Sequence, residues 1–531
     1  MPGPWRDTNG SGLLIAQVDV AQNESGGDFY YRTYAPGVGM AHCADTYVIN
    51  MVNIHRLKHE VMREADVLVL NNICDADVLP IARARKAEGK LTVFELCDDL
   101  EDIPLSSPVR AFYAQSKNML LIKRLAHYCD VLQFSSPELK RKYGYLNERT
   151  VVFPNHVLEI PPEINRGAGD KLIVGWGGSA GHLRDIARIS GRLIEWVMSR
   201  SDVHLYLMCA ENILDLFKKL PAKRKKHFPP GSMRDYHDFL THLDIGIAPL
   251  EDTPFNRSRS DVKFLEYAAH GVVPVVQATG PYLLSVENGK TGLFFRTTDE
   301  LIAKLDYLLA DKSARKTMSA NAREYVLRER NQLDRGLDRV NFYRGLIRQR
   351  ERAEGPNGGR VPDAFTRLSR YPGAVMKDRH LYLSATRFEL LLQAGVVSSD
   401  PNCPSRSWSL FREAIQTEPA SYLPYLLGAS VSGDPARMLQ KAIEMNPESI
   451  VSRLHLGMAY TSKEMFVEAV KSFEEAARIF PEYELPYIEC ANVLNRIGLK
   501  QEAVELMKKA IEVIPAVIRN GPATGPQCPV P

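Results

Sequence analysis

The residues best suited to chemistry lie at 256–295, where a polar loop leads into a helix-like run and then a strand-like run. Lys263 and Glu266 are three residues apart, which places them one turn apart on the predicted helix. A carboxylate at Glu266 can accept hydrogen bonds from two ribose hydroxyls. Ser260 and Asp261 precede this helix, where free backbone N–H groups and the helix dipole attract phosphate. The spacing favours a nucleotide site; the alternative is an ordinary helix with a solvated lysine and a surface or capping glutamate.

A glycine-containing stretch, GWGGSAGH (175–182), continues directly from a predicted strand. Glycines at this position let the backbone approach a ligand closely. The stretch does not fit the GxGxxG pattern, so a dinucleotide ligand is disfavoured, and a purely structural turn is the alternative. The candidate ligand contacts here are Gly177, Gly178 and Ser179.

Acidic residues follow the predicted strand 91–98 in the sequence ELCDDLEDIP (95–104). Asp98 and Asp99 fall at the carboxyl end of this strand and face the expected cleft. A carboxylate here can orient an acceptor hydroxyl or remove its proton as a general base. The alternative is a helix N-cap at either aspartate.

A fourth stretch, NESGGDFYYRTYAP (23–36), comes directly after the first predicted strand. We expect Arg32 to help bind an anionic group near Gly26 and Gly27. The alternative is a flexible surface loop with one solvated arginine.

Strand-like and helix-like runs alternate in the elements that must position these residues. Continuous apolar runs predict strands buried on both faces, as in parallel sheets. In the first part of the chain these runs are 13–20, 65–72, 91–98, 130–136 and 150–155, with helices predicted at 75–88 and 108–128. After a Pro- and Gly-containing linker at 157–170, the strand runs resume at 171–178, 203–209, 244–250, 271–277 and 291–296.

This alternation predicts two doubly wound α/β domains, with a charged helical stretch at 299–352 closing the second. Two such domains leave a cleft between them, and ligands bind outside the carboxyl ends of the strands. The GPNGGRVP segment (355–362) then marks a boundary by its glycine and proline content.

Beyond that boundary the chain is predicted to be helical and carries an internal repeat of 34 residues. Prolines recur at 447, 481 and 515, and alanines recur at 442, 476 and 510. Two full copies occupy 448–481 and 482–515, and their small residues allow paired helices to approach closely. The pattern resembles tetratricopeptide repeats, which stack into a concave surface for a peptide or protein. The alternative is that the repeats cap the enzyme or dimerise it.

Composition restricts the remaining function classes. The chain has 531 residues, 45% hydrophobic and 25% charged, and a formal net charge of +3, which gives no general reason to expect nucleic acid. The eight cysteines form no CxxC pair, so neither a zinc site nor a disulfide framework is predicted. Without a spanning run or signal-peptide core, we expect a cytoplasmic protein. The basic cluster 218–226 predicts a solvated helical face or, alternatively, peripheral contact with the inner face of a membrane.

The 256–295 stretch resembles the donor-binding segment of retaining glycosyltransferases of family 4, which have the GT-B fold. The residues that match are Glu266, Ala268, Ala269, Gly271, Pro274 and Val275, together with ENGKTGLFF at 287–295. The resemblance covers about 12–350 and implies transfer of a sugar from a nucleotide-sugar donor, with retention and without a metal or other cofactor. It also implies that Gly177–Ser179 lie near the diphosphate or sugar, and that Gly26 and Gly27 face the acceptor and donor phosphates.

The chain departs from the family at one position. The family commonly carries two glutamates with seven residues between them, and the position of the first is occupied here by Ser258. That glutamate normally faces the donor sugar, so its replacement puts the sugar contacts in doubt. The resemblance then makes Arg259 and Lys263 candidates for the diphosphate, where their charge would stabilise the leaving group.

The sequence thus predicts a two-domain GT-B α/β protein with twin Rossmann-like domains followed by an all-α repeat domain. The predicted segments are a tail (1–12), an acceptor-side domain (13–160), a nucleotide-sugar domain (161–352), a linker (353–363), repeats (364–519) and a second tail (520–531). The expected activity is glycosyl transfer to a glycan, a lipid-linked glycan or a protein, with a further protein partner on the repeats. The rival hypotheses are a nucleotide-sugar epimerase on the same fold and a scaffold with a weakened transferase core.

Overall fold

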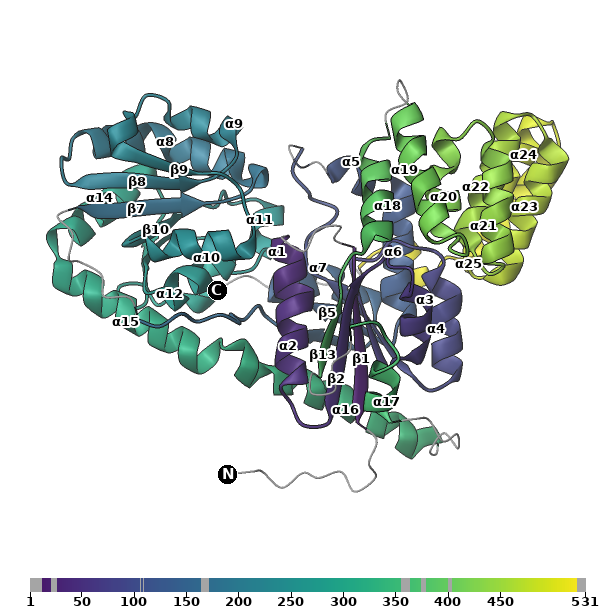
Figure 1. Ribbon diagram of the computed structural model, residues 1–531, viewed down its shortest axis with the longest axis horizontal. Coiled ribbons are helices and arrows are strands. Elements are labelled where there is room, and N and C mark those ends of the chain that lie inside the picture. The colour runs from purple at the N-terminus through teal and green to yellow at the C-terminus, as the bar shows by residue number, and fades with distance from the viewer. Residues whose placement is uncertain are drawn as a thin grey trace.

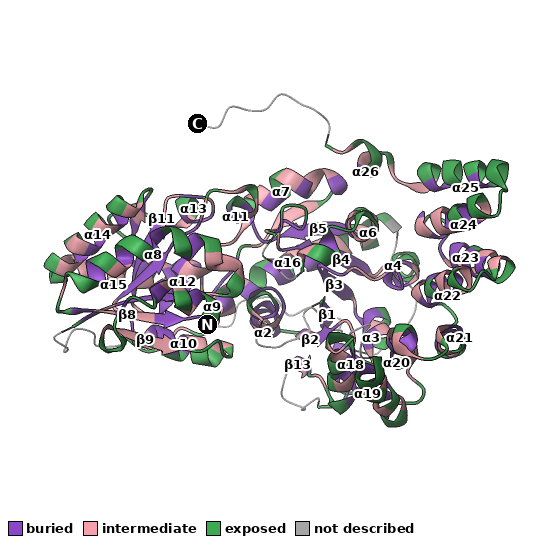
Figure 2. Ribbon diagram, turned by 90° about the horizontal axis from the view of Figure 1, so that it is seen from above, coloured by how far each residue is buried: buried purple, intermediate pink, exposed green. Residues whose placement is uncertain are grey.

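The protein, described here from a computed structural model, contains two parallel α/β sheets and a C-terminal array of helices (Figure 1). The structure describes residues 12–20, 26–105, 107, 109–163, 171–354, 363–373, 379–399 and 404–522. The predicted tails and the predicted linker fall mostly outside these residues. In Figure 2 the strands of both sheets form buried layers, and the helices that flank them expose their outer sides. The predicted twin Rossmann-like architecture followed by an all-helical region is confirmed.

The first sheet has seven strands, all paired in parallel. Their spatial order is β13 (His380–Leu383), β2 (Thr46–Val52), β1 (Leu13–Asp19), β3 (Val67–Asn71), β4 (Leu91–Leu96), β5 (Val131–Phe134) and β6 (Thr150–Val152). Alternate side chains of β1 enter opposite cores, which explains why its whole sequence is apolar or buried.

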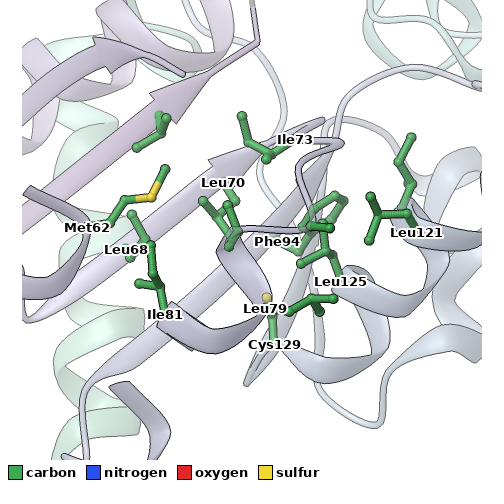
Figure 3. Packing of buried hydrophobic residues seen from close by; sticks show 14 of the residues in the cluster. Met62, Leu68, Leu70, Ile73, Leu79, Ile81, Phe94, Leu121, Leu125 and Cys129 are labelled. Atoms are coloured by element: carbon green, nitrogen blue, oxygen red, sulfur yellow. The ribbon is translucent and has the colours of Figure 1, made fainter. Parts of the chain in front are cut away.

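Helices cover both faces of this sheet. One face packs against α3 (Lys58–Glu64), α4 (Val78–Ala87) and α6 (Ser116–Tyr128). Figure 3 shows this packing, in which Leu68, Leu70 and Phe94 of the strands meet Leu79 and Leu125 of the helices. Burying each such side chain contributes about 1.5–3 kcal/mol. The other face packs against α2 (Ala35–Ala41) and α16 (Gln332–Glu354).

The second sheet has six parallel strands. Their order is β12 (Leu293–Phe295), β11 (Val273–Gln277), β10 (Ile245–Ala248), β7 (Leu172–Gly177), β8 (Val203–Met208) and β9 (Lys225–Phe228). One face packs on α8 (Leu183–Met198) and α14 (Thr298–Ala310), and the other packs on α10 (Met233–Thr241), α12 (Val262–Ala269) and α15 (Lys312–Glu329).

The basic cluster at 218–226 was predicted as a helical face, and the structure contradicts this. Its last residues begin the edge strand β9, and a short 3-10 turn, Ala222–Arg224, precedes that strand. Lys226 lies over the rings of Tyr206 and Phe228 at 5.7 and 4.6 Å. Lys225 and Lys226 lie on this edge strand, where lysines discourage pairing with another chain.

The first domain is not continuous in the sequence. After the second sheet is complete, α16 runs back from the second domain to the first (Figure 1). The strand β13 then pairs with β2, so residues assigned from sequence to the repeat region (364–519) complete the first sheet. The short helix α17 (Ala364–Leu368) also packs in the core of this sheet. The all-helical region therefore begins at α18 (Arg387–Val397), because β13 supplies the outer partner of β2.

The repeats form two helix pairs with the predicted period, α22 (Ile450–Ser462) with α23 (Phe466–Ile479), and α24 (Leu485–Arg496) with α25 (Lys500–Val513). The predicted small residues are buried between the helices, and each second helix ends shortly before a repeat proline. Glu464 and Gly498 occupy equivalent turns, with φ of 59° and 88°. Glycine adopts this left-handed conformation without steric cost, whereas Glu464 does not.

The helical array is fixed to the first domain by buried polar contacts as well as apolar packing. Arg124 of α6 and Glu484, which precedes α24, form an ion pair with side chains 3% and 2% exposed. Asp77 accepts hydrogen bonds from the Ser449 hydroxyl and the Val451 backbone N–H at 2.9 and 3.0 Å. Figure 1 shows the array beside α3, α4 and α6, away from the second domain.

No helix in the described ranges is long and apolar enough to cross a membrane.

Candidate functional site

A cavity of about 470 Å³ lies between the two domains, at the carboxyl ends of strands from both sheets. Its lining includes the second residue after β4, the first residue after β5 and the last residues of β7 and β8. These are Asp98, Ser135, Gly177 and Met208. Parallel α/β sheets bind ligands at this edge because the loops and helix N-termini converge there. Most of the sequence-predicted residues line this cavity, and three do not.

Glu266 lies on α12 and lines the second-domain wall, with 3% of its surface exposed. The helix ends after Ala269, and Gly271 turns the chain into β11 with φ of 67°. The Tyr31 hydroxyl donates to one carboxylate oxygen of Glu266 at 2.8 Å, and the Tyr236 hydroxyl donates to the other at 3.0 Å. Burial raises the pKa of Glu266, and Lys263 and the two tyrosines act against that rise.

Lys263 lies one turn before Glu266 and also lines the cavity. Its ammonium group donates to the backbone carbonyl of Gly177 and lies 5.7 Å from the centre of the Tyr236 ring. Burial, followed by the nearby Arg259, lowers the pKa of Lys263, whereas Glu266 raises it. The predicted helical spacing therefore brings a cation and a carboxylate to one wall.

Arg259 lines the cavity at the end of α11 (Pro254–Ser258). Its guanidinium lies 5.3 Å from the centre of the Phe255 ring, and its Nη1 lies 3.1 Å from Nε2 of His182. Nδ1 of His182 lies 2.8 Å from a carboxylate oxygen of Asp185. Burial and then Arg259 lower the pKa of His182 to about 4, so its ring is neutral at pH 7.

The glycine stretch after β7 lines the cavity at Gly177, Gly178 and Ser179. A Cβ atom at Gly177 would lie 2.7 Å from the Tyr236 ring, and one at Gly178 would lie 2.6 Å from the Trp176 ring. Both positions therefore require glycine for packing. This packing also keeps the backbone exposed to the cavity, so the structural and ligand-binding interpretations are compatible.

Ser260 and Asp261, which were predicted together, have different surroundings. Ser260 lines the cavity, and its hydroxyl accepts a hydrogen bond from the Asn155 amide of the first domain at 2.9 Å. Asp261 does not line the cavity. Its carboxylate forms an ion pair with Arg330, with both oxygens within 2.8 Å of the guanidinium nitrogens. The prediction of Asp261 as a donor contact is therefore corrected to a structural role at the domain junction.

The paired aspartates on the first-domain wall also separate. Asp98 lines the cavity, whereas Asp99 is 1% exposed and faces away from it. Asp99 accepts hydrogen bonds from the Tyr143 hydroxyl at 2.6 Å and from Lys142 at 2.7 Å. Burial and the nearby Asp28 raise the pKa of Asp98 to about 7, although Arg259 acts against that rise. Asp99 as a catalytic candidate is thus corrected, because its carboxylate is engaged in the domain core.

The stretch after the first strand is helical where the structure describes it. Residues Gly27–Phe29 begin a helix that continues through a π-helical segment, Tyr30–Tyr34, into α2. Gly27 and Arg32 line the cavity, but Gly26, at the helix start, does not. Arg32 is 3% exposed and bonds to Glu95 at 2.5 Å and to Asn155. The interpretation as a loop with a solvated arginine is therefore wrong.

Sequence analysis missed several residues of the site. Asp28 and Tyr31 lie beside the predicted Gly27 and Arg32, and the helical spacing of the segment could have indicated them. Tyr236 lies on α10, four residues after the N-cap Ser232, and no nearby motif suggests a ligand contact. Ser258 is 1% exposed, does not line the cavity and donates its hydroxyl to the Phe255 carbonyl. Within the described ranges, no group of three His, Cys, Asp or Glu residues could hold a metal ion.

Residues 188–336 match the model of a family described as glycosyl transferase-like. This stretch begins within α8 and ends in the first turns of α16, so it contains α12 and the loop that carries Arg259. No curated protein matches the sequence.

Several solved structures are similar in fold. The Anabaena Alr3699/HepE structure in complex with UDP is 13% identical, with 63% of this chain and 100% of that chain covered and a TM-score of 0.48. Sucrose-phosphate synthase (tll1590) from Thermosynechococcus elongatus is 14% identical, with 64% and 100% covered and a TM-score of 0.47. A glycosyltransferase from Rickettsia africae ESF-5 is 13% identical, with 63% and 99% covered and a TM-score of 0.45.

Proposed function

We propose that the chain is a glycosyltransferase that moves a sugar from a nucleotide-sugar donor to an acceptor hydroxyl. The observation that carries this proposal is the cavity between two parallel sheets, with Glu266, Lys263 and Arg259 on one wall and Asp98 on the other. The match of residues 188–336 to a glycosyl transferase-like family supports the same assignment. The acceptor is a glycan, a lipid-linked glycan or a protein.

The donor half of the site would bind the nucleotide through Glu266. Each carboxylate oxygen of Glu266 receives one tyrosine hydrogen bond, and each has a second lone pair with which to accept a ribose hydroxyl. Lys263 and Arg259 supply positive charge beside the glycine stretch, where the diphosphate would lie. As the bond between the sugar carbon and the diphosphate oxygen breaks, these cations stabilise the charge of the leaving nucleoside diphosphate.

The acceptor half would use Asp98. Its pKa of about 7 leaves a substantial fraction of the carboxylate ionised at neutral pH and able to take a proton. For the configuration to be retained, the acceptor oxygen bonds to the sugar carbon on the face from which the diphosphate leaves, as its proton passes to the Asp98 carboxylate. Because a second carboxylate, Asp28, lies nearby on the same wall, this region favours neutral hydroxyl-bearing groups over anions.

Contacts across the cleft would hold the two halves together during transfer. Tyr31 of the first domain reaches Glu266, Asn155 reaches Ser260, and the Ser136 hydroxyl donates to the Ser258 carbonyl at 2.7 Å. A closed cleft excludes the water that would otherwise hydrolyse the donor.

We further propose that the transfer retains the configuration of the sugar and needs no metal. Retention follows from the resemblance of the 256–295 stretch, and the paired cations Arg259 and Lys263 can supply the charge that a metal supplies in other transferases. NMR identification of the product anomer tests retention, and full activity in excess EDTA tests the metal-free mechanism.

We also propose that the repeats bind a protein, either the acceptor or an assembly partner. Their fixed attachment to the first domain, through Arg124–Glu484 and Asp77, supports this role because it holds a bound protein on the acceptor side. Loss of acceptor binding on disruption of the repeat surface, with donor hydrolysis unchanged, is the expected result if the protein is the acceptor.

The first experiment is a thermal-shift screen of the full chain against UDP, GDP, ADP, CMP and their sugars, repeated with Glu266→Ala. A ligand at about 100 times its dissociation constant adds ~2.7 kcal/mol to stability. A shift with one nucleotide, lost in Glu266→Ala and kept in the exposed control Glu287→Ala, supports the donor site. Binding with no transfer to any acceptor favours the scaffold, and interconversion of the donor sugar alone favours an epimerase.

A further inference from the structure

His182 contacts Arg259, the arginine proposed to bind the diphosphate, and both residues belong to the second domain. It lies at the start of α8, and its ring lines the cavity beside Arg259. The separation of 3.1 Å between Arg259 Nη1 and His182 Nε2 is a hydrogen-bond distance. Arginine has no acceptor atom, so the guanidinium is the donor and Nε2 must carry a free lone pair.

Asp185 determines which ring nitrogen carries the proton. One of its carboxylate oxygens lies 2.8 Å from His182 Nδ1, and only a protonated Nδ1 can donate to it. The other oxygen accepts from the Glu251 backbone N–H at 2.8 Å and from the Asn256 amide at 3.2 Å. Asp185 is 4% exposed, so this carboxylate is fixed by three groups of the protein and not by solvent.

The resulting chain runs from Asp185 through His182 to Arg259. Phe255 contacts the guanidinium as well, with its ring centre 5.3 Å from the central carbon. An arginine side chain loses considerable rotamer freedom when it is ordered, so a side chain held in advance binds an anion with a smaller entropic cost. The chain therefore orders a cation on the cavity wall before any ligand arrives.

We propose that His182, held by Asp185, is a positioning residue that orients Arg259 toward the diphosphate of the donor. This inference rests on the proposed function, because it assigns a ligand group to Arg259. His182 acts through Arg259 and does not itself take part in bond making. A neutral ring is required, because an imidazolium would present a second donor to the guanidinium and repel its charge.

The test measures binding of UDP, GDP, ADP, inorganic pyrophosphate, uridine, guanosine and adenosine to the full chain by titration calorimetry. His182→Leu, which removes the acceptor, should weaken diphosphate binding about tenfold, the effect of losing one hydrogen bond to a charged group. Nucleoside affinity should not change. His182→Gln keeps an oxygen that can accept from Arg259 and should restore most of the loss. His204→Leu, on β8 outside the cavity, is the control.

A double-mutant cycle identifies the residue through which His182 acts. In an Arg259→Ala background, the additional change His182→Leu should have no further effect on diphosphate affinity. Additive losses, or an equal loss of nucleoside and diphosphate affinity, would overturn the positioning role while leaving the donor site intact. If the wild-type protein bound none of the seven probes, the proposed function and this inference would both fail.

A ligand-free measurement tests the contact itself. In a long-range ¹H–¹⁵N spectrum of histidine-labelled protein at pH 7, the His182 ring should be neutral with its proton on Nδ1. A proton on Nε2 would contradict the geometry, because that nitrogen could not accept from Arg259. Asp185→Leu should abolish the preference for the Nδ1 proton, and the exposed neighbour substitution Arg184→Leu should not.

Discussion

The two walls of the cleft differ in charge and in how each wall is built. The second-domain wall presents two cations, Arg259 and Lys263, around the carboxylate of Glu266. The first-domain wall presents two carboxylates, Asp28 and Asp98, while its arginine, Arg32, is already bonded to buried Glu95. In the proposed reaction, phosphate charge would therefore be stabilised on one side only, and proton removal would occur on the other. This difference in charge would place the donor diphosphate on the second-domain wall and the acceptor on the first-domain wall.

The largest expected effect comes from removing the base on the first wall. Asp98→Asn keeps the shape of the side chain but not its ability to take a proton, so kcat should fall about 10²–10⁴-fold. Nucleotide affinity should be unchanged, because the donor contacts lie on the other wall. The measurement is steady-state kinetics with calorimetric nucleotide binding.

Asp99→Asn is the matched control for that variant. It should cost about 1–3 kcal/mol of stability through weakened bonds to Tyr143 and Lys142, with no specific loss of turnover. Full activity of Asp98→Asn would remove the functional contrast between the two walls.

The next effect comes from the cations on the second wall. Lys263→Met keeps the apolar stem but removes the charge, and kcat/KM for the donor should fall about 100-fold because transition-state charge on the diphosphate is lost. Lys290→Met, an exposed lysine of the same domain, should be silent. A similar loss in nucleoside binding would mean that Lys263 supports the fold and not the leaving group.

The pH dependence of kcat/KM reports on the protonation of Asp98, and therefore on the first-domain wall alone. The active form of Asp98 is the deprotonated one, so kcat/KM should rise with pH and level off above a midpoint of about 7. At pH 6, one unit below that midpoint, activity should be about tenfold lower than the plateau. The acid limb should vanish in Asp98→Asn and persist in Lys263→Met, as a pH–rate profile would reveal.

The smallest effect compares two tyrosines that donate to the same carboxylate from opposite walls. Tyr236→Phe removes a donor from the second wall and should weaken nucleotide binding about 2–10-fold. Tyr31→Phe removes a donor from the first wall and should lower turnover by a similar factor, with less effect on nucleotide affinity. Equal effects on affinity would show that the first wall belongs to the nucleotide site as well.

The site residues of the second-domain wall were easier to predict from sequence than those of the first-domain wall. On the second wall the decisive residues lie within one helix and the loop before it, so spacing alone brought Lys263 and Glu266 together. On the first-domain wall, Asp98 and Asp99 follow β4 in an irregular segment, where side-chain direction has no regular period along the sequence. Which of the two lines the cleft depends on the tertiary contacts of Asp99 with Tyr143 and Lys142, which lie more than 40 residues away in the sequence.

The two sheets were also only partly predictable from sequence. Strands buried on both faces, such as β1 and β7, were predicted from continuous apolar sequence. The strand β2 contains Asn50, a polar residue that is buried because Gln17 donates to its side chain across the sheet. Edge strands β9 and β13 are short, and the partner of β13 lies far away in the sequence. Their positions follow from packing and not from their own sequences.

The return of β13 to the first sheet affects the order in which the protein forms on the ribosome. His380 pairs with Val48, so translation must add more than 300 residues before β2 gains its outer neighbour. At about 5–20 residues per second, this interval is on the order of tens of seconds. Throughout it the edge of β2 is open to pairing with other chains, while the second sheet, contiguous from β7 to β12, can already close. The domain begun first is thus completed after the second sheet, and nascent copies on one messenger share that period of exposure.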